Sequence, residues 1–372
     1  MTIYTHIKEK ISASSNNCLT YADFIQIALY HPTYGYYMKD RKKVGKEGDF
    51  YTSSNVSNVF GKIFARHFYQ VYQTTNFSPV IYEMGGGTGR FAKQLLEEIK
   101  EIDVTFYKEL AYVMIETSAY HISEQKKLIP SDANVIYKSS LSECESINGI
   151  VFSNELYDAF PVHVVQMKNG EVHELFVSMN EKDDLIEVSY PLTNEQIKEY
   201  INEYSIELKE NQRFEIPLAM LEHLALVNST MEQGLLYTID YGYTLDDWRS
   251  PELVEGSLRG YYKHELIRDP LLYAGDMDLT THIHLYALEQ FGKQLGLQPC
   301  FTKKQGEFLL AAGILNLLQE NYDPNPFSEK SKQNRAIRSL IMDSGLSKGF
   351  TVVVQEKNCI VDWNSILEKP VF

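Results

Sequence analysis

The stretch from Val80 to Arg90 reads Val-Ile-Tyr-Glu-Met-Gly-Gly-Gly-Thr-Gly-Arg, a short apolar run that leads into closely spaced glycines. Directly behind it, residues 91–99 repeat apolar side chains at helical spacing and predict an amphipathic helix. Glycine density of this kind permits positive φ angles and lets the backbone approach a ligand, while the first turn of the helix offers free N–H donors. The stretch therefore predicts a strand, a ligand-binding loop and a helix in succession.

Further apolar runs predict a sheet around this strand. Several are separated by helical patterns, and strands that alternate with helices favour a parallel, doubly wound α/β sheet. Ligands bind such a sheet beyond the carboxyl ends of its strands. The additional predicted strands are 111–115, 134–137, 149–152, 235–239 and 350–354.

The remaining sequence predicts the domain organisation. Residues 1–77 carry mainly helical patterns and predict an N-terminal, mostly helical lobe, which is followed by the sheet domain over 78–372. Two insertions interrupt that domain. The first, about 162–230, opens with a hairpin pattern around Asn169-Gly170. The second, about 243–278, has no clear period and is interpreted as a lid, because long loops in compact domains usually serve function.

Composition argues against several classes of partner. The chain has 35 Lys and Arg against 50 Asp and Glu, a formal charge of −15 that would repel a polyphosphate backbone, so we expect no nucleic acid. The four cysteines lack metal-ligand spacing, and His282 and His284 lie two positions apart without a nearby H-E-x-x-H pattern, so we expect no metal. The sequence has no run of about eighteen apolar residues that would predict a membrane span, and no basic and apolar leader that would predict secretion. We therefore expect a cytoplasmic protein.

Glu116 follows the predicted strand 111–115 and is the candidate partner of a bound nucleoside. A carboxylate at a strand end can accept both hydroxyls of an adenosine ribose, although an exposed acid at that place is the simpler alternative. A dinucleotide fingerprint fits less well. Arg90 occupies the position of its third glycine, and Glu116 lies further along the chain than the expected spacing of about 20 residues. A nicotinamide oxidoreductase is therefore disfavoured.

A second polar cluster follows the strand 149–152, where the sequence continues Ser-Asn-Glu-Leu-Tyr-Asp-Ala-Phe-Pro. Its Asn154, Glu155 and Asp158 can hold an amine or guanidinium by hydrogen bonds and charge, and so align a nitrogen for attack. Turn residues and helix caps are the alternative interpretation of the same cluster.

With these residues in view, the chain resembles the MidA family over nearly its whole length. The mitochondrial member of that family is an arginine methyltransferase required for assembly of respiratory complex I. The likeness rests on several motifs taken together, which are Tyr30–Tyr37, Gly48–Ser53, the glycine loop after Glu83, Asn154–Val162, Asp240–Gly242 and Asp278–His282.

The resemblance implies a seven-stranded, Rossmann-like class I methyltransferase fold with an antiparallel final strand. It also implies S-adenosyl-L-methionine as cofactor and a protein acceptor, with arginine as the methylated residue and a respiratory complex subunit as partner. The candidate catalytic residues are Asn154, Glu155 and Asp158, and the candidate cofactor-binding residues are Glu83, Gly85, Gly86, Gly87, Gly89 and Glu116.

The chain departs from the family pattern at several places. The family usually has Pro-Glu where Ser54-Asn55 stand, an acid in place of Lys62, and an aspartate in place of His284. These departures leave a different protein or small-molecule acceptor open. The leading hypothesis is an N-methyltransferase that works by in-line displacement at the methyl carbon of the cofactor, and the alternative is a cofactor-binding assembly factor with little turnover.

Overall fold

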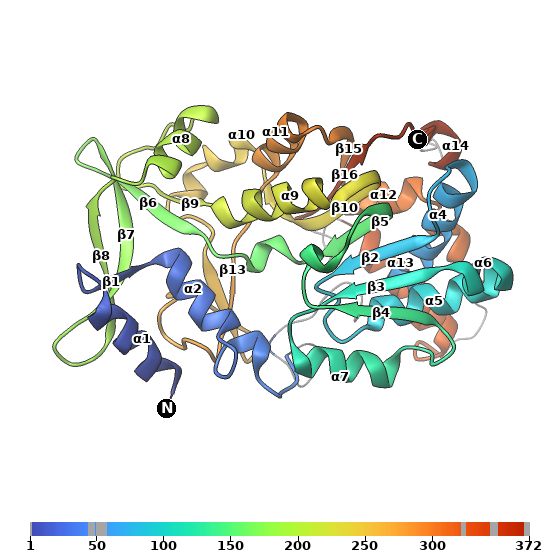
Figure 1. Cartoon of the computed structure of the whole chain (residues 1–372), viewed down its shortest axis with the longest axis horizontal. Helices are drawn as coiled ribbons and strands as arrows, with labels where there is room; N and C mark the ends of the chain where they lie inside the picture. The colour runs from blue at the N-terminus through green and yellow to red at the C-terminus, as the bar shows by residue number, and fades with distance from the viewer. Residues whose placement is uncertain (1, 44–48, 50–57, 321–324, 343–348, 368–372) are drawn as a thin grey trace. The chain divides into compact units, whose positions relative to one another are not determined.

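The computed structural model describes residues 2–43, 49, 58–320, 325–342 and 349–367 (Figure 1). The chain forms two compact units, each assembled from three segments. Unit 1 comprises Met1–Phe50, Tyr157–Leu224 and Tyr241–Phe291, and unit 2 comprises Tyr51–Leu156, Ala225–Asp240 and Gly292–Phe372.

Unit 2 is an α/β unit built on a large mixed sheet. Its strands follow the order β15-β16-β10-β5-β2-β3-β4. The last residues of β10, Gly242 and Tyr243, belong to unit 1 and pair there with β14 (Ile283–His284), the eighth strand. The neighbours from β4 to β10 run parallel, whereas β15 and β16 pair antiparallel. The strands are β2 (Val80–Met84), β3 (Ala111–Ile115), β4 (Asn134–Lys138), β5 (Ile147–Asn154), β10 (Met231–Tyr243), β15 (Gln298–Lys304) and β16 (Phe350–Lys357).

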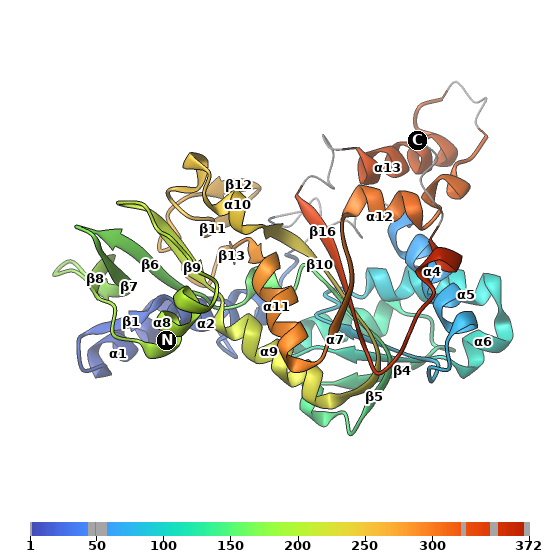
Figure 2. The same ribbon diagram turned by 90° about the horizontal axis from the view of Figure 1, so that it is seen from above.

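Helices of unit 2 pack an aromatic core onto this sheet. The ring of Phe91 stacks on that of Phe152 with centroids 4.3 Å apart, and Phe64 contacts Phe91, Phe152 and Phe308. Figures 1 and 2 show α4, α5 and α6 side by side. The helices are α4 (Val59–Thr74), α5 (Arg90–Ile102), α6 (Val104–Glu109), α7 (Ala119–Leu128), α12 (Gln305–Ala311), α13 (Glu329–Ile341) and α14 (Trp363–Ile366), with the short turns η2 (Leu141–Glu143) and η5 (Ile314–Leu317).

Unit 1 contains two antiparallel sheets. The larger has the order β1-β7-β6-β9 with β8 paired to β7, and the smaller has the order β12-β11-β13. The strands are β1 (Cys18–Thr20), β6 (His163–Lys168), β7 (Glu171–Met179), β8 (Leu185–Pro191), β9 (Arg213–Ile216), β11 (Arg259–Tyr262), β12 (Glu265–Ile267) and β13 (Asp278–Thr280).

Helices α1 and α2 cover the larger of these sheets through one apolar core, which includes Phe24, Leu29, Val164 and Leu175. The helices are α1 (Ile3–Ala13), α2 (Tyr21–Tyr30), α8 (Glu195–Glu203), α9 (Leu218–Thr230), α10 (Leu245–Trp248) and α11 (Leu285–Leu295), with the turns η1 (Tyr36–Met38), η3 (Tyr157–Ala159) and η4 (Pro251–Leu253). Helices α9 and α11 each contain a point at which the chain passes between the units.

The predicted hairpin is confirmed. Strands β6 and β7 pair antiparallel, and the two residues between them, Asn169 and Gly170, have φ angles of 54° and 81°. Positive φ at both central residues is what a two-residue hairpin turn of this kind requires, which is why the Asn-Gly pair was informative.

The division of the chain differs from the predicted boundary at 77/78. Helix α4 groups with the sheet because its buried aromatic side chains, Phe64 among them, pack against Phe91 and Phe152. Residues 1–50 group instead with 157–224 and 241–291, which overlap the two predicted insertions. The second predicted insertion, 243–278, also contains strands where no regular structure was expected, because β11 and β12 are too short to show a period.

Candidate active site

The glycine loop begins where β2 ends and continues until α5 starts at Arg90. Gly85, Gly87 and Gly89 have φ angles of 67°, 50° and 81°. The N–H of Gly85 donates to the carbonyl of Ile115 at the end of β3, at 3.0 Å, so the loop starts beside the neighbouring strand. The sequence-predicted succession of strand, loop and helix is confirmed.

Only some of these glycines face open space. A Cβ added to Gly87 would meet no atom within 4 Å among the described residues, whereas one on Gly85 would lie 2.8 Å from Leu156. A Cβ on Gly86 would lie 2.7 Å from Met114, and one on Gly89 would lie 3.0 Å from Gln125. A side chain at Gly85, Gly86 or Gly89 would therefore crowd its neighbours, whereas Gly87 has open space beside its backbone.

Glu83 lies beneath the loop and is 3% exposed. The hydroxyl of Tyr112 donates to its Oε2 at 2.8 Å, and a Cβ on Gly86 would lie 2.9 Å from its carboxyl carbon. Burial raises the pKa of Glu83 to about 7, with a further contribution from Glu116, while the hydrogen bond from Tyr112 opposes the shift. Glu83 thus packs closely against the loop at Gly86.

Glu116 stands just after β3, at the same edge of the sheet as the loop. Its Oε1 accepts from the N–H of Ser118 at 2.8 Å, and its Oε2 lies 3.4 Å from Nδ1 of His121. A carboxylate has about four acceptor positions. These two contacts leave acceptor capacity on Glu116 for the hydroxyls of a ligand.

Two residues of α7 contact this site, and no sequence prediction included them. Nε2 of Gln125 donates to the carbonyl of Gly87 at 2.7 Å, and His121 contacts Glu116. Both side chains are buried. Polar residues on a helix suggest a solvated face, so the sequence held no signal that could have identified them.

Asn154 and Glu155 lie together where β5 ends in unit 2. Nδ2 of Asn154 donates to Oε1 of Glu155 at 3.0 Å, while Oδ1 of Asn154 is buried and has no hydrogen-bond partner among the described residues. Glu155 has a φ angle of 53°, and its N–H donates to the carbonyl of Ile239 at 2.9 Å. Positive φ in a residue other than glycine is uncommon and is concentrated at functional sites.

Asp158, the third predicted acceptor residue, belongs to unit 1. Oγ1 of Thr280 donates to its Oδ2 at 3.1 Å, and the N–H of Thr281 donates to its backbone carbonyl at 2.8 Å. Burial raises the pKa of Asp158, whereas the bond from Thr280 and the charge of Arg259 lower it. The prediction placed Asp158 with Asn154 and Glu155, and the structure groups it with Thr280 and Arg259 in the other unit.

Asp278 is a second buried carboxyl group of unit 1, and the charge of Asp158 acts on it. The hydroxyl of Tyr37 donates to its Oδ1 at 2.7 Å. Burial, together with the charges of Asp158 and Asp49, raises the pKa of Asp278 to about 8, although the hydrogen bond from Tyr37 opposes the shift. The neutral acid is therefore the form that the fold favours at neutral pH.

This shift gives a stability prediction for Asp278→Asn. A folded pKa of about 8 against an ordinary 3.8 means that Asp278 stabilises the fold below about pH 4 and that this contribution is lost as the pH rises towards 8. The amide mimics the neutral acid and still accepts from Tyr37. We expect the variant to exceed wild type in unfolding free energy by an amount that grows between pH 5 and 8, at up to about 1.4 kcal/mol per pH unit. Urea unfolding of both proteins across this range measures the difference, and a constant difference would contradict the assignment.

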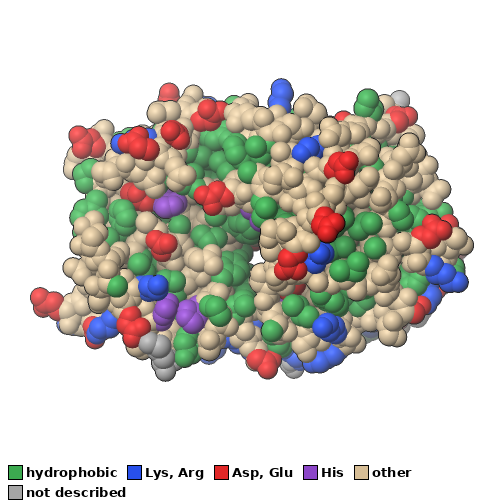
Figure 3. Space-filling view, viewed as in Figure 1, with side chains coloured by type: hydrophobic (Ala, Val, Ile, Leu, Met, Phe, Trp, Pro, Cys, Tyr) green, Lys and Arg blue, Asp and Glu red, His purple; other side chains and the backbone are tan. Residues whose placement is uncertain are grey.

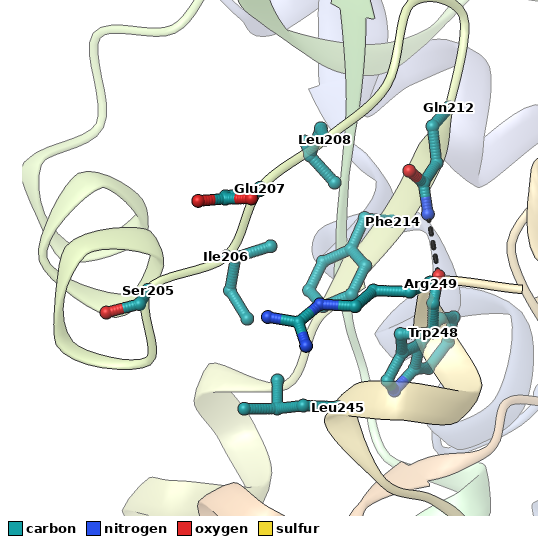
Figure 4. Close-up of a pocket in the computed structure, with 9 residues that line it drawn as sticks. All are labelled: Ser205, Ile206, Glu207, Leu208, Gln212, Phe214, Leu245, Trp248 and Arg249. Atoms are coloured by element: carbon teal, nitrogen blue, oxygen red, sulfur yellow. Dashed lines mark hydrogen bonds between the residues drawn. The ribbon is translucent and has the colours of Figure 1, made fainter.

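One small pocket in unit 1 is shown in Figure 4. Phe214 and Trp248 contact each other in its wall, and Nε2 of Gln212 donates to the carbonyl of Trp248 at 2.9 Å. Its volume of about 20 Å³ is enough for roughly one water molecule and far below the size of a nucleoside. The lining residues are Ser205, Ile206, Glu207, Leu208, Gln212, Phe214, Leu245, Trp248 and Arg249.

The residues at which this chain departs from the family pattern do not share one environment. Nζ of Lys62 lies 3.0 Å from Oε2 of Glu98, which also binds Arg66, so Lys62 belongs to an ion-pair group of α4 and α5. His284 is buried, and its Nδ1 lies 2.6 Å from the hydroxyl of Tyr200. Ser54 and Asn55, and most of the motif Gly48–Ser53, lie outside the described residues.

Neither a metal site nor a membrane-spanning helix is found among the described residues. They contain no group of three or more His, Cys, Asp or Glu side chains placed to hold a metal ion. Among the same residues, no helix combines the length and apolar character needed to cross a bilayer. On the face shown in Figure 3, Lys and Arg side chains are dispersed among acidic ones.

Comparison with known proteins identifies the family. The sequence profile of a family described as S-adenosyl-L-methionine-dependent methyltransferases matches residues 63–301, well over half of the chain. The mitochondrial protein arginine methyltransferase of Mus musculus is 25% identical over 342 residues, covering 83% of this chain and 73% of its own. Its homolog in Drosophila melanogaster is 23% identical over 336 residues, covering 81% and 75%. These matches confirm the resemblance drawn from the sequence motifs.

Solved structures share the fold. The crystal structure of a Burkholderia thailandensis protein bound to S-adenosyl-homocysteine superimposes with a TM-score of 0.88 at 23% identity, covering 99% of this chain and 95% of that one. A second crystal structure of a Burkholderia thailandensis protein gives a TM-score of 0.85 at 24% identity, with the same coverage. An α/β fold with a large mixed sheet, similar to that of methyltransferases, is confirmed.

The predicted cytoplasmic location is corrected by this comparison. The relatives in Drosophila melanogaster, Mus musculus and Homo sapiens are named as mitochondrial proteins. The features behind the prediction, which were the lack of a long apolar run and of a basic and apolar leader, do not distinguish the cytoplasm from the mitochondrion.

The cofactor follows from the family, which uses S-adenosyl-L-methionine. The glycine loop and Glu116 supply the backbone opening and the carboxylate that the sequence associated with a nucleoside ligand. This chain belongs to the family of S-adenosyl-L-methionine-dependent methyltransferases.

Proposed function

We propose that this methyltransferase binds S-adenosyl-L-methionine at the Gly85–Gly89 loop and Glu116, and transfers its methyl group to an arginine nitrogen of a protein acceptor. One observation supports this cofactor site above all. Gly87, with open space beside its backbone, and the carboxylate of Glu116 follow the adjacent parallel strands β2 and β3, at the edge where both strands end.

The residues fit this cofactor in three respects. Gly87 leaves space that a side chain would fill. The N-terminus of α5, which follows Gly89, offers N–H groups and a favourable dipole to the carboxylate of the amino-acid portion. Glu116 keeps acceptor capacity for the two ribose hydroxyls. When bound, the cofactor supplies a methyl group on a positively charged sulfur.

The acceptor residues orient the nucleophile in this proposal. The carboxylate of Glu155 and Oδ1 of Asn154, which is buried without a partner among the described residues, accept N–H bonds from the acceptor and direct one nitrogen towards the methyl group. Asp158, the third predicted acceptor residue, belongs to unit 1 and stays a prediction. In this proposal the carboxylate of Glu155 takes the proton that the nitrogen releases.

An arginine in a protein is the acceptor class that best fits these groups and the family. The curated relatives are named protein arginine methyltransferases. The formal charge of −15 favours approach of a cationic segment. The MidA resemblance extends the proposal to a subunit of a respiratory complex as the partner.

The strand order of the large sheet also leads to a proposal about the fold. We propose that the path from β15 to β4 is the seven-stranded, doubly wound class I sheet, with β16 as its antiparallel strand. The order of its strands and the antiparallel pairing of β15 with β16 support this.

Methyl transfer is tested directly. The protein is incubated with S-adenosyl-L-methionine labelled on its methyl group and with a mitochondrial lysate, and labelled proteins are analysed by mass spectrometry. Labelled methylarginine supports the proposal. Label on another residue would overturn the arginine assignment. Tight binding of S-adenosyl-homocysteine with no transfer would favour the assembly-factor alternative, which family membership does not favour.

Glu116→Ala tests the ribose contact. Hydrogen bonds to a charged acceptor contribute about 1.5 to 3 kcal/mol, so the affinity for S-adenosyl-homocysteine should fall by roughly ten- to a hundredfold. Calorimetric titration measures this fall. Glu124→Ala, which removes another α7-side carboxylate that pairs with Lys127, is the control and should bind normally. A loss below twofold in Glu116→Ala would leave the residue an acid at a strand end.

A further inference from the structure

Helix α7 buries two polar side chains on one face. His121 and Gln125 lie four positions apart, so they stack on the same side of the helix, and they are 6% and 0% exposed. Burial of a polar group costs free energy unless it is hydrogen-bonded. Their contacts therefore indicate why these side chains are polar.

Gln125 holds the glycine loop. Its Nε2 donates to the carbonyl of Gly87 at 2.7 Å, and its Oε1 is buried without a partner among the described residues. The bond to Gly87 therefore sets the orientation of the amide. The helix also packs tightly here, because the Cα of Gln125 lies 3.2 Å from the place where a Cβ on Gly89 would stand.

His121 holds the carboxylate of Glu116. Its Nδ1 lies 3.4 Å from Oε2, and the N–H of Ser118 binds Oε1 at 2.8 Å. The side chain of Ser118 in turn accepts from the N–H of His121 at 3.4 Å and caps the helix. The first turn of α7 thereby contacts Glu116, the acid that follows β3.

We propose that α7 is a positioning helix for the cofactor, in which His121 acts through Glu116 and Gln125 acts through Gly87. This inference rests on the proposed cofactor site and adds two residues to it. One helix thereby fixes both the carboxylate for the ribose and the carbonyl of Gly87 in the loop. Preorganisation of this kind lowers the cost of ordering the site when the ligand binds.

Gln125→Met tests the loop contact, since methionine keeps the side-chain length and removes the donor. We expect the affinity for S-adenosyl-homocysteine to fall about three- to tenfold, as for the loss of one hydrogen bond and of the loop order it maintains. Gln125→Glu keeps the shape but turns an acceptor towards the Gly87 carbonyl, so its affinity should fall at least as far. Both variants are measured by calorimetry beside thermal unfolding.

The matched control is Gln94→Met. Gln94 is also a buried glutamine of unit 2, but its Oε1 accepts from the N–H of Gly61 and links α5 to α4. This control should lose stability to a similar degree and keep its affinity for S-adenosyl-homocysteine. Equal affinity losses in Gln94→Met and Gln125→Met would show a general effect of destabilisation and overturn the proposal.

His121 is tested with a double-mutant cycle, which isolates a pairwise coupling. His121→Leu should weaken binding about three- to tenfold in the wild-type background and less than twofold when Glu116 is already Ala. His121→Asn, whose amide can replace the Nδ1 contact, should restore most of the affinity. Gln125→Met should keep its full effect in the Glu116→Ala background, because it acts through the loop.

The outcomes separate this inference from the cofactor site itself. If Glu116→Ala and Gly87→Val both left affinity unchanged, the proposed cofactor site would be wrong. If those variants weakened binding while Gln125→Met and His121→Leu did not, the site would stand and the role of α7 would be refuted. Additive effects of His121→Leu and Glu116→Ala would likewise refute action through Glu116.

Discussion

Gly87→Val is expected to abolish binding of the cofactor while the protein remains folded. The position combines a φ angle of 50° with open space around the missing Cβ, so a branched side chain would both strain the loop and occupy the space that the ligand needs. Steric exclusion of this kind has a larger effect than the loss of one hydrogen bond. We expect no measurable heat of binding with S-adenosyl-homocysteine at concentrations that saturate wild type.

The control separates backbone strain from exclusion. Gly296 of unit 2 has a φ angle of 100°, and a Cβ added there would also meet nothing within 4 Å among the described residues. Gly296→Val should therefore be destabilised by about 1 to 3 kcal/mol, as strain predicts, and should still bind the cofactor. Gly87→Ala, with its smaller side chain, should show an intermediate loss. Unchanged affinity in a folded Gly87→Val protein would remove the loop from the site.

Glu155→Gln should slow methyl transfer by about a hundredfold and leave cofactor binding unchanged. Misplacement of a reacting group by about 1 Å costs a factor of this order, and the amide can no longer hold a cationic nitrogen by charge. The side chain can still accept from Asn154, so the turn should be preserved. Single-turnover transfer beside titration with S-adenosyl-homocysteine gives both quantities.

Glu145→Gln serves as the comparison for this experiment, because Glu145 is exposed and precedes the same strand. It should transfer methyl groups at the wild-type rate. If Glu155→Gln did the same, Glu155 would be a turn residue without a part in orienting the acceptor. A parallel loss of cofactor affinity would place Glu155 against the cofactor instead.

The central sheet could be predicted because its strands are buried apolar runs between turn signals. The predicted strand 111–115 matches β3, and the predicted hairpin matches β6 and β7. Strand β15 was missed because it lies at the sheet edge and contains Pro299 and Lys303, which weaken an apolar pattern. The two units could not be predicted, because each is assembled from three separated segments whose contacts are long-range.

The candidate site was predictable to a similar extent. Glycines before a helix and acids after strands leave a local signal, and neighbouring parallel strands bring Gly87 and Glu116 to one edge. Gln125 and His121 leave no such signal, since their burial follows from how α7 packs against the loop. The sequence also could not assign Asp158 to a different unit from Glu155, three residues earlier.

The left-handed backbone at Glu155 has a consequence for engineering the protein. Glycine adopts this conformation more readily than glutamate, so a design procedure that maximises thermal stability would tend to replace Glu155 with glycine. The proposed role of its carboxylate implies that such a variant would be more heat-resistant and a poorer catalyst. Selection for activity and selection for stability would then favour opposite residues at this one corner of the chain.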